Sequence, residues 1–360
     1  MRLSIFVAGW GRTALIRSKG LPAFLSELKQ HKLAGLEATA PELGQSLEDK
    51  VATCRLLDAH GLRLIFSAYT SWLGYEGTHP GFTAPSEHLD ALQRELALAA
   101  ELQAAVPGIL AHVNINGGCD SFDEAQANEY YDGAIDQVER FVAAQGTTDG
   151  ARRGVSHETH RGRPLFHPTP TRRLLKRYAG RLRLTLDMSH WHVASERAPG
   201  YGVTTNRPEP EVLGPANHAW GAQEAAAAEV EAELPPGLLE ERRVLHEDVF
   251  SAVEHIHSRI GTAQTAQTPP GEAADPNTLR AHVAMWRTVW AHMRASGARE
   301  ALMTPEYGPG YFTGQSCVRT PWSPEQLWEQ TLNGAAHMRD EFAAWEGGRP
   351  PTGGGPRPAE

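Results

Sequence analysis

Short apolar runs recur eight times along the chain, and longer segments with apolar residues at helical spacing lie between them. The runs are Leu3–Ala8, Leu36–Thr39, Leu62–Tyr69, Ile109–Asn116, Arg153–Glu158, Leu182–Asp187, Val253–His257 and Ala301–Glu306. Runs this short and apolar suit parallel strands buried on both faces. Eight strands alternating with helices predict an α/β chain folded as one (β/α)8 TIM barrel. A doubly wound open sheet is the alternative, but Gly9-Trp10-Gly11 is no dinucleotide-binding fingerprint.

Three helix starts are marked by a capping side chain or a proline. Ser86 precedes a segment with leucines at helical spacing, and Asp275-Pro276 and Ser323-Pro324 open two more. A short polar side chain satisfies free backbone N–H groups, and proline suits the first helical position. Trp286 and Trp290 lie at helical spacing in the second of these segments and are expected to pack against the barrel.

Two stretches break the alternation of strands and helices. Residues 197–237 are rich in Pro, Gly, Ala and Glu and are interpreted as a disordered or loosely helical insertion after the sixth strand. Residues 347–360 are rich in Pro and Gly and are expected to be a disordered tail. The barrel domain is therefore expected to span residues 1–346.

Composition excludes several classes of function. The formal net charge is -9 and no basic block is present, which argues against nucleic acid as a partner. No apolar run approaches the ~20 residues that a membrane-spanning helix needs. Cys54, Cys119 and Cys317 have no paired spacing, as expected of reduced thiols inside a cell. We expect a cytoplasmic protein with a small-molecule substrate, and the sequence is compatible with a homo-oligomer.

Ionisable side chains collect where the last four predicted strands end. They include Glu158 and His160, Asp187 and His190, His255 and His257, and Glu306. Strand ends on one face of a barrel converge on a common pocket, and several buried carboxylates there are costly unless a cation neutralises them. Carboxylates together with imidazole suit Mn, Mg, Fe(II) or Zn. The sequence therefore predicts one divalent metal ion.

This pattern resembles the xylose isomerase-like superfamily, also called the AP endonuclease family 2 barrels. Its members place metal ligands as Glu on strand five, Asp on strand six with a His three residues on, His on strand seven and Glu on strand eight. The resemblance covers about residues 3–346 and implies a metal shell of Glu158, Asp187, His257 and Glu306. On strand seven, alternation directs both His255 and His257 to the same face, and the family pattern favours the later one.

The resemblance also bears on the type of centre. Endonuclease IV-like members bind three metals through additional histidines on strands three and four. Here Ser67-Ala68-Tyr69-Thr70 and Asn114-Ile115-Asn116-Gly117 supply no histidine, which argues against a trinuclear phosphodiesterase centre.

The predicted activity is that of a metal-dependent isomerase or epimerase of a small sugar-like or keto-polyol substrate. Glu158 and Glu306 would move a proton through an enediolate as the catalytic pair. Six side chains are expected to bind substrate: Trp10, Asn116, His160, Arg161, His190 and Arg259. Glu37, at the end of strand two, is a weak candidate for substrate contact. The alternatives are a lyase or dehydratase acting on similar substrates, or a metal-binding barrel without catalysis.

Overall fold

The structure is a computed structural model that describes most of the chain. The described ranges are 1–71, 83–145, 154–200, 236–263, 265–268, 276–308 and 322–349. Most of the predicted insertion (201–235) and of the predicted tail (350–360) lies outside these residues, as do Asp275 and Cys317.

Eight parallel strands close into a barrel in sequence order, each hydrogen-bonded to the next and β8 to β1. The strands are β1 (Arg2–Ala8), β2 (Gly35–Thr39), β3 (Arg63–Tyr69), β4 (Leu110–Asn116), β5 (Val155–Glu158), β6 (Leu184–Asp187), β7 (Val253–His257) and β8 (Glu300–Thr304). Each coincides with a predicted run to within two residues at either end, so the predicted (β/α)8 barrel is confirmed.

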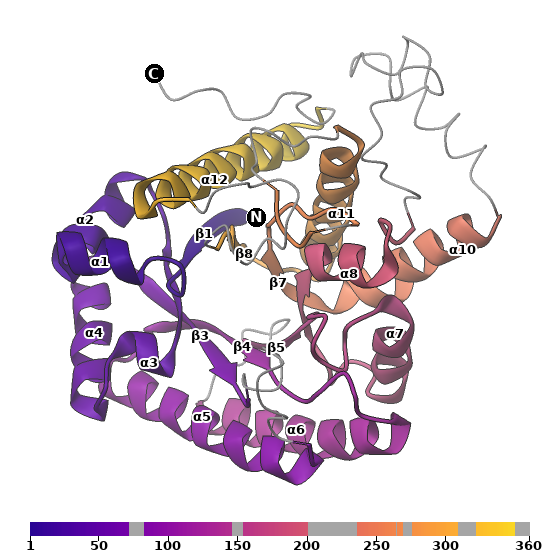
Figure 1. The fold of residues 1–360 in the computed structure, drawn as a ribbon, viewed down its shortest axis with the longest axis horizontal. Coiled ribbons are helices and arrows are strands. Elements are labelled where there is room, and N and C mark those ends of the chain that lie inside the picture. Colours follow the sequence, from indigo (N-terminus) through magenta and orange to yellow (C-terminus); the bar gives the residue numbers. More distant parts are fainter. Residues whose placement is uncertain are drawn as a thin grey trace.

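Helices surround the strands (Figure 1). They are α1 (Thr13–Lys19), α2 (Leu21–Gln30), α3 (Ala40–Leu43), α4 (Leu47–Ala59), α5 (Pro85–Ala105), α6 (Glu124–Gln145), α7 (Pro168–Arg177), α8 (Met188–Ser195), α10 (Pro236–Val244), the short η3 (Leu245–Val249) and η4 (Phe250–Ala252), α11 (Pro276–Ala295) and α12 (Pro324–Glu346). Within the described residues, no helix is long and apolar enough to cross a membrane.

α11 begins at Pro276 as predicted, and the caps predicted for the two other helices can be compared with the structure. Ser323 caps α12 as predicted, because its hydroxyl accepts a hydrogen bond from the Gln326 N–H. The cap predicted at Ser86 is wrong, since α5 already begins at Pro85. There the Glu87 carboxylate accepts the backbone N–H groups of Thr83 and Ala84 at 3.1 and 3.0 Å. A carboxylate in the first turn has replaced the hydroxyl as the capping group.

The hydrophobic core lies between the strands and the helices. Trp286 and Trp290 of α11 are fully buried there, which confirms their expected packing role. Inside the barrel, by contrast, the apolar cluster is small and is formed by Phe6, Ile65 and Leu302.

A hydrogen-bonded line of polar side chains fills the barrel interior and is called here the polar chain. Its members, in order, are His112, Ser156, Thr185, His255 and Thr304. The Ser156 hydroxyl lies 2.6 Å from both His112 Nε2 and Thr185 Oγ1, and His255 lies 3.3 Å from Thr185 and 3.0 Å from Thr304. Buried polar groups need such partners, and the members of the polar chain supply them to one another.

Candidate metal centre

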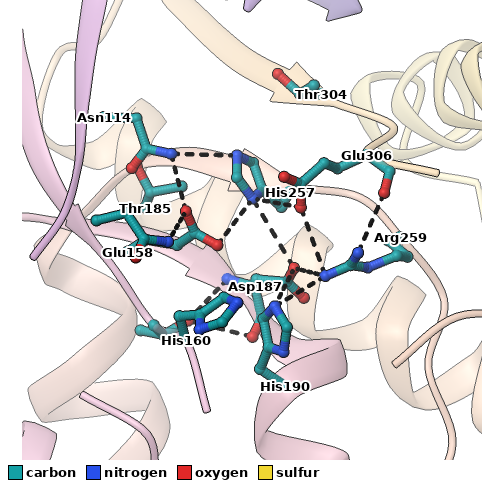
Figure 2. A network of polar contacts seen from close by, with 12 residues as sticks. Asn114, Glu158, His160, Thr185, Asp187, His190, His257, Arg259, Thr304 and Glu306 are labelled. Carbon is teal, nitrogen blue, oxygen red and sulfur yellow. Dashed lines mark hydrogen bonds and ion pairs between the residues drawn. The ribbon is translucent and has the colours of Figure 1, made fainter. Parts of the chain in front are cut away.

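Four strand ends bring one imidazole and three carboxylates together. Donor atoms of Glu158, Asp187, His257 and Glu306 all lie within 4.8 Å of one another, and all four residues are buried. Figure 2 shows Glu158 and Glu306 on the two sides of the His257 ring. The side chains point inward because alternate residues of β5, β6 and β7 face the barrel axis. The structure thus brings together the four side chains predicted as metal ligands.

His257 directs one ring nitrogen at the carboxylates. Its Nδ1 lies 3.1 Å from Glu306 Oε2, 3.5 Å from Glu158 Oε1 and 3.8 Å from Asp187 Oδ2. It has no hydrogen-bond partner among the described residues, although it is buried. His255 lies one level deeper, in the polar chain. The geometry therefore favours His257 over His255 as the strand-seven ligand.

Glu37 fixes the orientation of this imidazole. Its Oε1 lies 3.0 Å from His257 Nε2 and also accepts hydrogen bonds from Asn114 and Ser67. In the neutral form of the ring, a proton on Nε2 would leave the Nδ1 lone pair directed to the point between the carboxylates, where a metal would bind. Burial by itself would raise the pKa of Glu37, but His257 and His255 outweigh it and lower the pKa to about 2. Glu37 is thus an ionised partner of the predicted ligand, a role that was not expected from the sequence.

The two carboxylate oxygens of Asp187 make different contacts. Its Oδ1 accepts the backbone N–H of Ser189 at 2.8 Å and so caps α8, which begins at the next residue. Its Oδ2 is the atom that faces His257 Nδ1. The capping role fixes the carboxylate by local backbone geometry.

Amide side chains of β4 hold Glu158. Its Oε2 accepts hydrogen bonds from Asn114 at 3.1 Å and from Asn116 at 3.0 Å. Asn116 in turn accepts a hydrogen bond from the buried Arg163. Asn116 was predicted to bind substrate, but it is not among the residues that line the cavity. The structure places it behind Glu158 as a support.

Arg259 lies against the carboxylates from the opposite side. Its Nη2 is 2.7 Å from Asp187 Oδ2 and 3.5 Å from Glu306 Oε2, and it donates to His190 Nε2 at 2.9 Å. Its Nε donates to Ser189 Oγ at 3.1 Å. Figure 2 shows the guanidinium between Glu306 and the His190 ring.

The pKa values of the cluster reflect burial and crowded charge. Burial alone would lower the pKa of His257, but surrounding carboxylates, led by Glu306 and Glu37, raise it well above its ordinary value. Burial raises the pKa of Glu306, and His257 only partly offsets this. For Glu158 the balance is opposite, because His257 outweighs burial and lowers the pKa. Without a cation the cluster is a set of carboxylates held around an imidazolium.

The donor set fits a divalent ion. An imidazole nitrogen without a hydrogen-bond partner and three carboxylate oxygens face one point, which is the mixed O/N shell typical of Mn, Mg, Fe(II) or Zn. Three carboxylates carry more negative charge than the Arg259 guanidinium offsets, and a divalent cation would neutralise the excess.

A cavity of about 570 Å³ opens beside this cluster. Five of the six side chains predicted to bind substrate line it, together with the predicted catalytic pair: Trp10, Glu158, His160, Arg161, His190, Arg259 and Glu306. Its wall also contains residues not predicted from the sequence, among them Ser67, Tyr69, Glu95 and Gln267. A cavity of this size suits a small organic molecule.

His160 and His190 stand together in the cavity wall, with ring centroids 3.8 Å apart. Burial lowers the pKa of His160 to about 3 and that of His190 well below its ordinary value. His160 Nδ1 accepts the Gly162 N–H at 3.2 Å, and His190 Nε2 accepts from Arg259. Each ring is therefore neutral and carries its proton on the other nitrogen, as a hydrogen-bond donor.

Packing and hydrogen bonds hold Trp10 against Glu306. The indole Nε1 donates to Glu306 Oε1 at 3.1 Å. A Cβ at Gly308 would lie only 2.0 Å from Trp10, so the ring packs directly on this glycine. The Gln267 side chain in turn pairs with the backbone N–H and carbonyl of Gly308, both at 2.9 Å. The loops after β7 and β8 are thereby locked together beneath the indole.

No family model and no curated protein match the chain. Solved structures similar to it include an AP endonuclease, family 2, from Brucella melitensis (12% identity, 86% of this chain, 93% of that chain, TM-score 0.45). They also include a D-tagatose 3-epimerase-like protein (11% identity, 96% of this chain, 99% of that chain, TM-score 0.49).

A third similar structure matches only part of this chain. The probable 3-DHS dehydratase involved in petrobactin synthesis from Bacillus anthracis has 16% identity and a TM-score of 0.38 over 53% of this chain. The chain spans 64% of that protein, slightly less than two thirds of its length. Likeness at these levels carries no argument about activity, which must come from the site itself.

Proposed function

We propose that the protein is a divalent-metal-dependent isomerase or epimerase of a small sugar-like or keto-polyol substrate. One observation carries the proposal: two carboxylates, Glu158 and Glu306, face one imidazole nitrogen from two sides at the wall of a substrate-sized cavity. Glu158, Asp187, His257 and Glu306 would hold the ion. When bound, the ion would polarise a substrate carbonyl and so acidify the neighbouring C–H bond.

The protein's own side chains would then move the proton. A substrate carbon between Glu158 and Glu306 can lose a proton to whichever of the two is a carboxylate and, through an enediolate, receive a different proton from the other as a carboxylic acid. His160 and His190 present neutral N–H donors on the same wall, suited to hydroxyl or carbonyl oxygens. Trp10 covers the site with an apolar ring and holds Glu306 by its indole N–H.

The experiment has two steps. Purified protein is first analysed for bound divalent metal, and it is then incubated in D2O with a panel of keto sugars and cyclitols. Solvent deuterium at the carbon next to the carbonyl, dependent on the metal, supports the proposal. A metal-loaded protein that exchanges no proton with any member of the panel would contradict it.

A second candidate is a lyase or dehydratase. It uses the same proton abstraction but expels a hydroxyl group from the next carbon, for which Glu306 or His160 is placed as a proton donor beside the cavity. The same panel separates the two, because elimination yields a dehydrated product whereas epimerisation conserves mass.

A further inference from the structure

One nitrogen of Arg259 lies among three side-chain atoms of the kinds that bind metal ions. Its Nη2 is surrounded by Asp187 Oδ2 at 2.7 Å, His190 Nε2 at 2.9 Å and Glu306 Oε2 at 3.5 Å. Two carboxylate oxygens and an imidazole nitrogen are the atoms that bind divalent ions. We propose that the Arg259 guanidinium is a fixed second cation of the centre, which limits the protein to one divalent ion.

The guanidinium is anchored by protein contacts on its other nitrogens. Its Nε donates to Ser189 Oγ at 3.1 Å and its Nη1 to the Glu306 carbonyl at 3.3 Å. Arg259 is only 6% exposed, so these contacts are not shared with bulk water. Gly261 makes room for the arrangement, since a Cβ there would lie 2.5 Å from the Ser189 Cβ. A guanidinium held at three corners is a fixed charge.

Chain geometry explains why the cation comes from this position. Arg259 lies two residues beyond His257, which is the last residue of β7. The same short segment therefore delivers one proposed metal ligand and the cation beside it. Because Arg is always protonated, this positive charge is present at every working pH.

The guanidinium also decides the role of His190. By donating to Nε2, Arg259 takes the lone pair that a metal would need and leaves His190 as a hydrogen-bond donor through Nδ1. His190 Nε2 and Asp187 Oδ2 are 3.6 Å apart. Ligands at about 2.1 Å from one ion lie about 3–3.5 Å apart, so only a small adjustment separates this pair from a metal-binding pair. Removal of the guanidinium should therefore create a second metal site.

The inference rests on the metal centre of the proposed function, and its test counts ions. Each protein is equilibrated with Mn²⁺, freed of excess ion by dialysis and analysed for bound Mn²⁺ per chain. Wild type should hold one ion and Arg259→Ala two. The two ions should show spin coupling in the electron paramagnetic resonance spectrum, because they share Asp187 and Glu306. Arg259→Ala combined with His190→Ala should return the count to one.

Two variants control for charge and folding. Arg161→Ala removes a different cation of the same cavity and should leave the count at one. Arg259→Lys retains a single positive charge and should also hold one ion. If Arg259→Ala does not fold, Arg259→Gln keeps an amide that can reach Ser189 without the charge, and it should bind two.

The outcomes are distinguishable. A wild type that binds no Mn²⁺ removes the proposed metal centre and, with it, the premise of the inference. A wild type with one ion whose folded Arg259→Ala and Arg259→Gln variants also hold one overturns the role of the arginine and leaves the proposed function standing. Two ions in wild type, or in Arg259→Lys, would equally overturn it.

Discussion

Glu37 Oε1 lies 3.0 Å from His257 Nε2, so a carboxylate on β2 orients an imidazole on β7, a strand that is not its neighbour in the barrel. The contact fixes which ring nitrogen faces the three carboxylates of the candidate centre. A buried carboxylate behind a ligating histidine also raises the basicity of that histidine, which strengthens its bond to a metal.

Replacing Glu37 by Gln should weaken binding of a divalent ion about 10- to 100-fold, the usual effect of losing such a partner. Isothermal titration of the metal-free protein with Mn²⁺ measures this directly. Glu42→Gln is the matched control, because Glu42 lies at the same barrel end but caps α3 through Thr39. Equal affinities in wild type and Glu37→Gln would show that Glu37 does not prepare His257 for a metal.

Glu306→Gln keeps a coordinating oxygen but removes the carboxylate. It should retain much of the metal and slow exchange of the substrate's carbon-bound proton by roughly 10²–10⁴-fold. Glu158→Gln should produce a comparable loss, with the defect on the opposite face of the substrate. Exchange rates from NMR in D2O on a confirmed substrate give the measurement. Wild-type exchange in Glu306→Gln would refute the two-glutamate mechanism.

Gly308→Ala should displace Trp10, since the added Cβ would lie 2.0 Å from the indole ring. Overpacking of this kind costs about 1–3 kcal/mol of unfolding free energy, and the Trp10 hydrogen bond to Glu306 should be lost as well. Urea unfolding checks the cost. In a Trp10→Ala background the same substitution should cost much less, because the ring is gone.

A comparison glycine tests whether this effect is specific. A Cβ at Gly237 of α10 meets nothing within 4 Å, and Gly237→Ala should be neutral or slightly stabilising. A Gly308→Ala variant as stable as wild type would mean that the Trp10 side chain can move to another conformation at no cost in stability.

Stability should depend on pH through Glu95 of α5. Burial raises the pKa of Glu95 from 4.5 to about 7, so the folded protein binds this proton more tightly than the unfolded chain. The contribution is therefore fully present below pH 4.5 and is lost as the pH rises through about 7. Because the group is partly exposed, the loss is on the order of 1 kcal/mol. Glu95→Gln should remove this part of the pH profile, measured by urea unfolding from pH 4.5 to 8.

The exposed Glu101 on the same helix provides the comparison, since its substitution by Gln should leave the profile unchanged. A Glu95→Gln profile parallel to that of wild type would assign the pH dependence to other groups.

The barrel was predictable because its signal is local. Each buried strand is a short apolar run, and the closing strand pair, β1 with β8, follows from the count of runs. The convergence of Glu158, Asp187, His257 and Glu306 was also accessible, because each stands at or just after the end of its strand. Helix starts were less certain, as the misplaced start of α5 shows: a glutamate can cap the helix in place of a serine.

The supporting residues could not be found this way, because their roles depend on distance across the barrel. Nothing near Glu37 in the sequence indicates that it meets His257, 220 residues away. Asn116 stands at a strand end like the ligands do, yet the neighbouring Arg163 and Glu158 turn it into a support. Arg259 was expected to bind substrate, and the sequence cannot show that its donors face Asp187, Glu306 and His190.

The polar chain beneath the centre has a consequence for any attempt to move this site into another protein. A designer who grafts the four proposed ligands onto a barrel with the usual aliphatic filling would transfer only the upper tier. Glu37 and His255 would be left behind, so the imidazole of His257 would lose the partner that sets its tautomer. A working graft would therefore have to include the layer of polar side chains below the four ligands as well as the ligands themselves.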